Sequence, residues 1–197
     1  ADTAFAYACN SRNSVTLAID KGKAFNGALN IVDSRQSDLN LADVFANDGS
    51  IQLRISADAD MLETIPADVS ADNSGSTAGA DSNNIDLGTA ASPRLLSNTN
   101  VVDFLVDCGQ VLDEQSVSDE GRWIVLPPWT IALIKRSDLR IASLAGDGVS
   151  ILRNGKVGEV DRFTIYMSRN VLQQTSPAVS SYVVFGHSAG LTFAAQI

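Results

Sequence analysis

The sequence is poor in the side chains from which metal sites and catalytic sites are built. Its 197 residues include one histidine and two cysteines, Cys9 and Cys108, which cannot form a zinc site of cysteine and histidine ligands. Paired carboxylates are missing as well, because Asp58 and Asp60 lie two positions apart in a predicted helix and their side chains diverge. We therefore expect no metal, no cofactor and no catalytic residue, and we interpret both cysteines as buried thiols.

Positive charge and long apolar runs are also scarce. Fourteen basic residues against 23 acidic ones give a net charge of −9. A protein that binds nucleic acid through its phosphates needs clustered Lys and Arg, so direct DNA binding is not expected. The longest apolar stretch, residues 123–134, contains two prolines and is shorter than the ~18–20 residues that span a bilayer. The first residues carry neither the basic nor the apolar region of a signal peptide, so we predict no membrane partner and no secretion signal.

The apolar residues that are present suffice for a folded core. Hydrophobic residues make up 45% of the chain and charged residues 19%, which is typical of globular proteins and excludes a wholly disordered chain. Helical spacing of apolar residues predicts amphipathic helices over residues 38–64, with a kink or break at Gly49, and over residues 100–113. The apolar run 123–126 predicts a buried strand, and residues 129–136 predict a short helix that begins beside a proline.

Other stretches alternate between apolar and polar residues, as half-buried strands do. Residues 14–32 predict a hairpin that projects from the domain, with its turn at residues 20–23. Residues 149–168 predict strands around a turn at Asn154-Gly155, because this dipeptide favours tight hairpins. Residues 182–197 predict two final strands.

The stretch from Ser70 to Ser92 differs from the rest in composition. Apart from Ile85 and Leu87, its residues are all Ser, Ala, Asp, Asn, Gly or Thr. So little apolar surface cannot order a segment, and we expect a flexible, exposed insertion. The whole chain is thus predicted to be an α+β protein with a projecting hairpin, one long helix, a loop insertion and a mixed lobe.

One motif suggests an enzyme. Residues 186–190, GHSAG, match the Gly-x-Ser-x-Gly motif of serine hydrolases, with Ser188 as the nucleophile, and follow an apolar strand. That motif requires an acidic residue and then a histidine later in the chain, whereas neither follows Gly190, and the single histidine, His187, is adjacent to the serine. The alternation after Gly190 also favours a strand where the motif requires a helix. We expect no enzyme, and a hydrolase fragment remains a remote alternative.

Four segments resemble the major capsid proteins of tailed bacteriophages and occur in the order of that family. They are SVTLAIDKGKAFNGALNIVDSRQSDLN, LDEQSVSDEGRWIVLPPWTIALI, NGKVGEVDRFTIYMSRNV and GHSAGLTFAAQI. The second segment carries a Gly-Arg-Trp, apolar strand, Pro-Pro pattern that is similar to the family's. The resemblance covers most of residues 14–69 and 100–197 and implies the α+β Hong Kong 97-like capsid fold.

That fold implies an arm, an extended loop, a long spine helix and two domains. The corresponding ranges are 1–13 (remnant of the N-terminal arm), 14–37 (extended hairpin loop), 38–66 (spine helix of the peripheral domain), 67–178 (axial domain, with the flexible insertion 70–92) and 179–197 (return to the peripheral domain). In this family the extended loop lies over a neighbouring subunit. The residues near its tip are therefore candidate subunit contacts, namely Asp20, Lys21, Gly22, Lys23 and Phe25.

The function that the resemblance implies is structural. The chain would self-assemble into pentamers and hexamers of an icosahedral phage head, which encloses double-stranded DNA without sequence-specific binding. The implied partners are other copies of the chain, together with scaffolding, portal and cement proteins. The implied location is the virion, after assembly in the cytoplasm of the host bacterium. The same fold also forms the shells of bacterial encapsulating nanocompartments, which is the nearest alternative.

Overall fold

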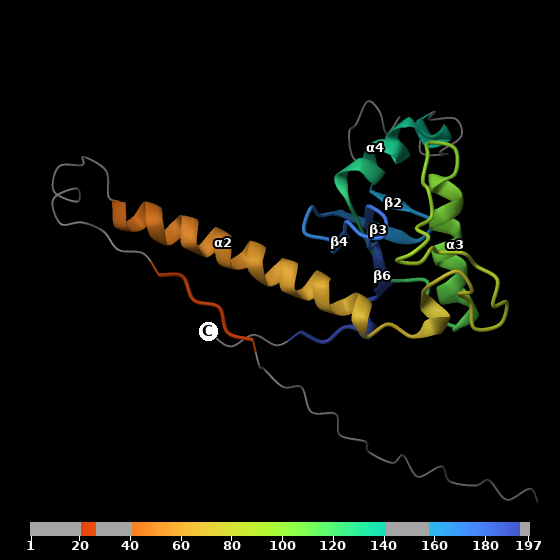
Figure 1. Ribbon diagram of the computed structural model, residues 1–197, viewed down its shortest axis with the longest axis horizontal. Helices are drawn as coiled ribbons and strands as arrows, with labels where there is room; N and C mark the ends of the chain where they lie inside the picture. The colour runs from red at the N-terminus through yellow and green to blue at the C-terminus, as the bar shows by residue number, and fades with distance from the viewer. Residues whose placement is uncertain (1–20, 27–40, 141–157, 194–197) are drawn as a thin grey trace, which may run out of the picture.

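The computed structural model describes residues 21–26, 41–140 and 158–193. A long helix, α2 (Leu41–Thr64), extends away from a lobe that contains two shorter helices and a mixed sheet (Figure 1). At 1.5 Å per residue, α2 is about 36 Å long. The predicted arm, most of the predicted hairpin with Asp20, the Asn154-Gly155 turn and residues 194–197 lie outside the described residues. The last predicted strand is wrong in its described part, because residues 191–193 have no regular secondary structure.

The sheet of the lobe has four strands in the order β2-β3-β1-β6. Its strands are β1 (Arg122–Leu126), β2 (Glu159–Val160), β3 (Phe163–Met167) and β6 (Val184–His187). The two central strands are parallel, and both edge strands are antiparallel to their neighbours. A separate two-stranded ladder joins β4 (Gln173–Gln174) to β5 (Ser180–Ser181).

Helix α3 (Val101–Glu114) supplies most of the helical side of the core. Its stripe of Val101, Phe104, Leu105, Cys108 and Leu112 is buried, as its helical spacing predicts. These side chains form one cluster with residues of β1, β3 and α4 (Pro128–Arg136). Beside this cluster, the rings of Phe163 and Phe185 meet edge to face at 6.2 Å, which adds a directional contact to the apolar burial.

The elements predicted for the centre of the lobe are found in the structure. The predicted strand 123–126 is found as β1, whose side chains alternate between buried and half-buried positions. The predicted helix 129–136 is found as α4, with Pro128 in its first turn, where a missing N–H costs nothing. Lys135 and Arg136 occupy its last turn, where positive charge complements the helix dipole.

The prediction of a kink at Gly49 is wrong. Helix α2 is continuous from Leu41 to Thr64, and Gly49 is its one buried residue. The reason for the glycine is steric. A Cβ atom placed there would lie 2.4 Å from Cδ1 of Phe25, so only glycine lets the ring approach the helix this closely.

The prediction that residues 70–92 cannot order themselves is also wrong. The segment begins with a 3₁₀ turn at Ala71–Asn73, and Ala78 and Ile85 then pair through two backbone hydrogen bonds of 2.9 and 3.0 Å. Both side chains are buried against Val111 of α3. The two apolar residues suffice because α3 contributes the remaining surface of this small core.

The hairpin that joins β2 to β3 turns at Asp161-Arg162, a dipeptide without the usual turn signal. Both residues have positive φ, 47° and 65°, as a two-residue hairpin of the favoured twist requires. Glycine or asparagine normally occupies such positions, so this turn could not be predicted from composition. Interactions elsewhere must offset its strain.

Candidate subunit-contact site

The predicted contact residues that the structure describes lie along α2 of their own chain. Residues 21–26 run beside the helix without regular secondary structure (Figure 1). Lys21 Nζ donates a 2.9 Å hydrogen bond to Thr64 Oγ1, and Lys23 Nζ forms a 3.0 Å ion pair with Asp60 Oδ2. We call residues 21–26 the strap. No turn is assigned at Lys21 to Lys23, so the described residues give no sign of the predicted hairpin tip.

Phe25 is the apolar anchor of the strap. Its ring lies against the bare backbone of Gly49 and remains 44% exposed, so it is seated on the helix and not enclosed by it. Gly49 and Asp60 are eleven positions apart, which places them about 20° apart around the helix and on one face. We call this face of α2, formed by Gly49, Asp60 and Thr64, the strap face. Gly22, by contrast, has open space around it.

The opposite face of α2 is apolar and uncovered in the described structure. Val44, Ile51 and Ile55 are 56%, 54% and 44% exposed. At 100° per residue they point about 120–160° away from Gly49, so the strap does not reach them. A soluble helix normally buries such a stripe. The projecting helix therefore carries more exposed apolar surface than a solitary subunit needs.

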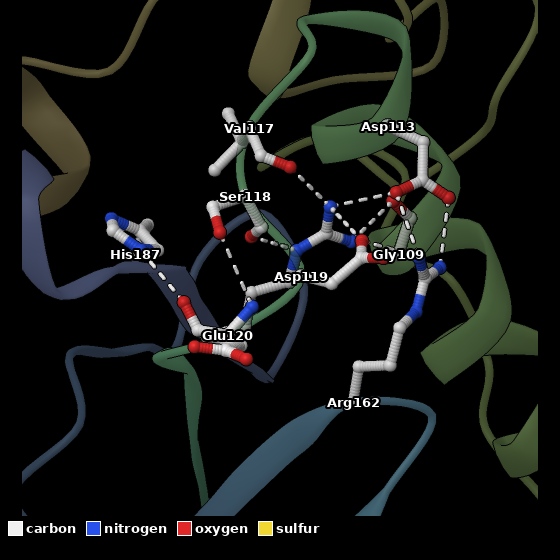
Figure 2. A network of polar contacts seen from close by, with 9 residues as sticks. Gly109, Asp113, Val117, Ser118, Asp119, Glu120, Arg162 and His187 are labelled. Atoms are coloured by element: carbon white, nitrogen blue, oxygen red, sulfur yellow. Dashed lines mark hydrogen bonds and ion pairs between the residues drawn. The ribbon is translucent and has the colours of Figure 1, made fainter.

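In the lobe, a network of charged groups connects α3, the start of β1 and the β2–β3 hairpin (Figure 2). The Arg122 side chain is completely buried at the start of β1. Its Nε donates to the carbonyl of Ser118 at 2.9 Å and one terminal nitrogen donates to that of Val117 at 2.6 Å. The same nitrogen lies 2.7 Å from Asp113 Oδ1 and 3.1 Å from Asp119 Oδ1. The other terminal nitrogen faces the carbonyl of Gly109. A buried guanidinium is tolerated because its donors are paired.

Arg162, from the strained turn, completes this network. Its two terminal nitrogens bind both oxygens of Asp113, at 3.1 and 2.8 Å, and one of them also lies 2.7 Å from Asp119 Oδ1 (Figure 2). The hydrogen bond from Arg162 holds the pKa of Asp113 below its usual value; burial opposes this effect and Arg122 adds to it. The two-pronged contact offsets the strain of the positive φ at Arg162 and ties the β2–β3 hairpin to α3.

The sequence did not assign a role to this network. Arg122 is the arginine of the Gly-Arg-Trp pattern, and Asp113 and Asp119 precede it closely in the sequence, so local signals were present. The missing information was spatial. Arg162 lies 49 positions beyond Asp113, and only the fold brings the two together.

A second carboxylate orders the 70–92 segment. Glu114 Oε2 accepts hydrogen bonds from the backbone N–H groups of Asp81 and Ser82, both at 3.0 Å, and Oε1 accepts one from Gln110 at 2.9 Å. The amide of Ser82, followed by the Gln110 side chain, lowers the pKa of Glu114 to about 2. The ionised Glu114 side chain at the end of α3 therefore holds residues 81 and 82 of this segment, for which the sequence indicated no partner.

The geometry around Ser188 does not fit a hydrolase. Both nitrogens of His187 are engaged with the backbone, since Nε2 lies 2.8 Å from the carbonyl of Glu120 and Nδ1 accepts from the N–H of Ala189 at 3.1 Å. Neither nitrogen is free to take a proton from Ser188. The serine begins a 3₁₀ turn of three residues, whereas a nucleophile elbow leads into an α-helix.

The part of the chain that the structure describes holds neither a metal cluster nor a helix that could span a membrane. Within residues 21–26, 41–140 and 158–193, no cluster of three or more His, Cys, Asp or Glu side chains could hold a metal ion. Among the helices of these ranges, none combines the length and the hydropathy needed to cross a bilayer. Cys108 is buried, as predicted, and burial raises the pKa of its thiol, which makes it unreactive. Cys9 lies outside the described residues.

Comparison with known proteins gives matches among solved structures. No protein-family model and no curated protein matches the sequence. A chain of Mycobacterium phage Che8 superposes with a TM-score of 0.52 at 20% identity, over 75% of this chain and 47% of that one. A chain from the asymmetric unit of the bacteriophage PhiM1 mature capsid superposes with a TM-score of 0.51 at 16% identity, over 81% of this chain and 53% of that one.

These matches show an α+β fold similar to that of the two phage chains. The chain spans about half the length of the two phage chains. Identities of 20% and 16% are too low to transfer a function, but the shared α+β arrangement confirms at the level of the fold the resemblance to phage capsid proteins seen in the four sequence segments.

Proposed function

We propose that this chain is a major capsid protein with the Hong Kong 97-like fold, which assembles into pentamers and hexamers of an icosahedral phage head around double-stranded DNA. The observation that carries the proposal is the similarity of its fold to a chain of the PhiM1 mature capsid. Its place is the virion, after assembly in the cytoplasm of the host bacterium. Its main partner is itself, and scaffolding, portal and cement proteins are further partners in a head of this kind.

The two-part shape suits such a role. In the proposed assignment, α2 lies within the spine helix at 38–66, and most of the lobe belongs to the axial domain at 67–178. The strap belongs to the extended loop at 14–37, and residues 179–197 return to the peripheral domain. A shell of identical subunits is built from repeated contacts between unlike surfaces, and projecting elements provide such surfaces. The uncovered apolar face of α2 fits a helix that is covered only in an assembly.

The charge of the chain is compatible with a container for DNA. With 23 acidic and 14 basic residues, the protein carries a net charge of −9. A wall of this charge repels packaged phosphates and does not hold them in place. The proposal therefore includes enclosed DNA but no bound DNA site.

Electron microscopy and sedimentation of the natural full-length protein test the proposal. We expect closed particles or rings of five and six subunits. Particles that contain DNA identify a phage head, whereas particles filled with protein cargo identify a nanocompartment shell. A chain that stays monomeric at all concentrations and is labelled by a fluorophosphonate probe, with labelling lost in Ser188→Ala, would overturn the proposal in favour of a hydrolase.

A deletion sharpens the test. Removal of residues 20–23 takes away the charged part of the strap but leaves the lobe intact. We expect a folded subunit with normal circular dichroism and a reduced yield of particles. A deletion that unfolds the subunit would show that the strap belongs to the core of the monomer.

A further inference from the structure

We propose that the β2–β3 hairpin is a salt-sensitive latch, in which the Arg162 side chain holds a strained turn closed against α3. When the ion pairs of Arg162 with Asp113 and Asp119 break, the turn relaxes and β2 separates from β3. This inference goes beyond the proposed function, because it concerns a local opening within one chain and holds whether or not the chain forms a shell.

Two unfavourable features lie in the same turn. Asp161 and Arg162 both have positive φ, 47° and 65°, which raises the free energy of residues other than glycine. The Oδ2 atom of Asp161 is buried and receives no hydrogen bond from the described residues. It lies on the bare backbone of Gly109, where a Cβ atom would be 2.5 Å from it. A buried carboxylate oxygen without a donor destabilises the closed turn further.

The contacts that hold the turn on α3 come from the Arg162 side chain. It donates to both oxygens of Asp113, at 3.1 and 2.8 Å, and lies 2.7 Å from Asp119 Oδ1 (Figure 2). The ladder of β2 adds little, because this strand has only two residues, each paired with one residue of β3. The closed turn therefore depends on Arg162 more than on the sheet.

The moving part of the hairpin is short. Phe163, the first residue of β3, is fully buried and pairs with Arg122 of β1. Its ring also meets that of Phe185 edge to face. Strand β3 therefore stays in the sheet, and opening is confined to Glu159–Arg162.

The contacts of Arg162 are accessible to salt. The side chains of Arg162, Asp113 and Asp119 are 38%, 41% and 65% exposed. Charges in water are screened over ~10 Å at 0.1 M salt and over ~3 Å at 1 M, so added salt weakens these ion pairs. The neighbouring ion pair of Arg122 with Asp113 is better shielded, because the Arg122 side chain is fully buried. Salt does not relieve the positive φ of Asp161 and Arg162, so it shifts the turn towards the open form.

Opening changes the edge of the sheet. In the closed form β2 lies beside β3, and the N–H of Ile165 donates to the carbonyl of Gly158 at 3.1 Å. Once β2 has separated, β3 becomes the edge strand, and its backbone groups on that side are open to water or to another extended strand. The latch thus determines whether this edge is paired.

Hydrogen exchange of single amides measures the opening. The Ile165 amide reports on β2, and the Ser168 amide, which donates to the carbonyl of Leu126 at 3.0 Å, reports on the contact between the β3 and β1 ends. Both are followed by mass spectrometry of the full-length protein at about 0.02 M and about 0.5 M salt. We expect exchange at Ile165 to become several-fold faster at the higher salt, while exchange at Ser168 stays unchanged. Unchanged exchange at Ile165, or equal acceleration at both amides, would overturn the inference.

Two variants separate the ion pairs from the strain. Arg162→Gln removes the ion pairs but keeps a residue with a Cβ atom at positive φ, so exchange at Ile165 should rise about tenfold and lose its salt dependence. The double variant Asp161→Asn with Arg162→Gly removes the same ion pairs but supplies the dipeptide that favours this kind of turn. It should protect Ile165 as well as the native protein does at low salt, again without salt dependence.

Equally fast exchange at Ile165 in the two variants would show that no strain is stored and would contradict the latch. The salt dependence of the native protein tests the inference even where a variant fails to fold.

Discussion

The lobe and helix α2 place their charged and apolar side chains in opposite environments. In the lobe, Arg122 is fully buried and its donors meet carbonyl and carboxylate oxygens of the same chain. On α2, the apolar residues Val44, Ile51 and Ile55 face outward, and Asp60 meets Lys23 of the strap at the surface. The lobe pairs its buried charge within one chain, whereas α2 leaves apolar side chains exposed to solvent. This contrast is what a subunit of a larger assembly requires.

The largest expected effect on the free energy of unfolding comes from removing the Arg122 contacts in the lobe. Arg122→Met leaves the carbonyls of Val117 and Ser118 without their donor and removes one of the two arginines from Asp113. Removing one partner of a buried charge pair costs about 3–5 kcal/mol, and we expect a loss of that size in the free energy of unfolding. Trp123 and Trp129 are both in the lobe, so urea titration followed by tryptophan fluorescence measures it directly.

Arg54→Met on α2 is the matched control for that variant. Arg54 is exposed, and its replacement should change stability by no more than about 0.5 kcal/mol. Equal losses for the two arginines would contradict the contrast between lobe and helix.

A smaller loss of stability, also within the lobe, is expected when the pH falls and Glu114 is protonated. The pKa of Glu114 is lowered to about 2 in the folded protein, while an unfolded glutamate titrates near 4.3. Because the folded pKa is depressed, the stabilisation is complete above the unfolded value and is lost as the pH falls towards 2. Between pH 5 and 2, the urea midpoint of the native protein should fall more than that of Glu114→Gln. Parallel curves would show that the carboxylate does not order residues 70–92.

The smallest effect on stability is expected at the strap. Gly49→Ala gains about 1 kcal/mol of helix propensity but drives a methyl group into the Phe25 ring. We expect the lobe, followed by tryptophan fluorescence, to keep its stability, while the yield of a carbodiimide cross-link between the ion-paired Lys23 and Asp60 declines. Phe25→Ala in the same background removes the clash and should restore part of the cross-link. A loss of more than about 2 kcal/mol in Gly49→Ala would place the strap in the core.

Sequence reasoning succeeded where the information was local. Helices α2, α3 and α4 and strand β1 were predicted because their apolar periods and prolines lie within each segment. It failed where a distant group decides the structure. Gly49 was interpreted as a break because its partner, Phe25, lies far away in the sequence, and residues 70–92 were interpreted as unordered because Val111 and Glu114 supply their contacts.

The candidate contact site shows the same limit. The choice of Lys21, Lys23 and Phe25 came from the family resemblance, and the structure places all three along α2. Their role between subunits remains a prediction. The network of Arg122 and Arg162 could not be derived from sequence, because the turn that presents Arg162 lacks glycine and asparagine.

The partners of Arg122 also suggest an order of events in time. Gly109, Asp113, Val117, Ser118 and Asp119 all precede it by thirteen residues or fewer. Arg162 follows forty positions later. Contacts between near neighbours close small loops and form early, so the part of the network around Arg122 can form before Arg162 joins it. The β2–β3 hairpin then docks onto a surface that is already prepared for it.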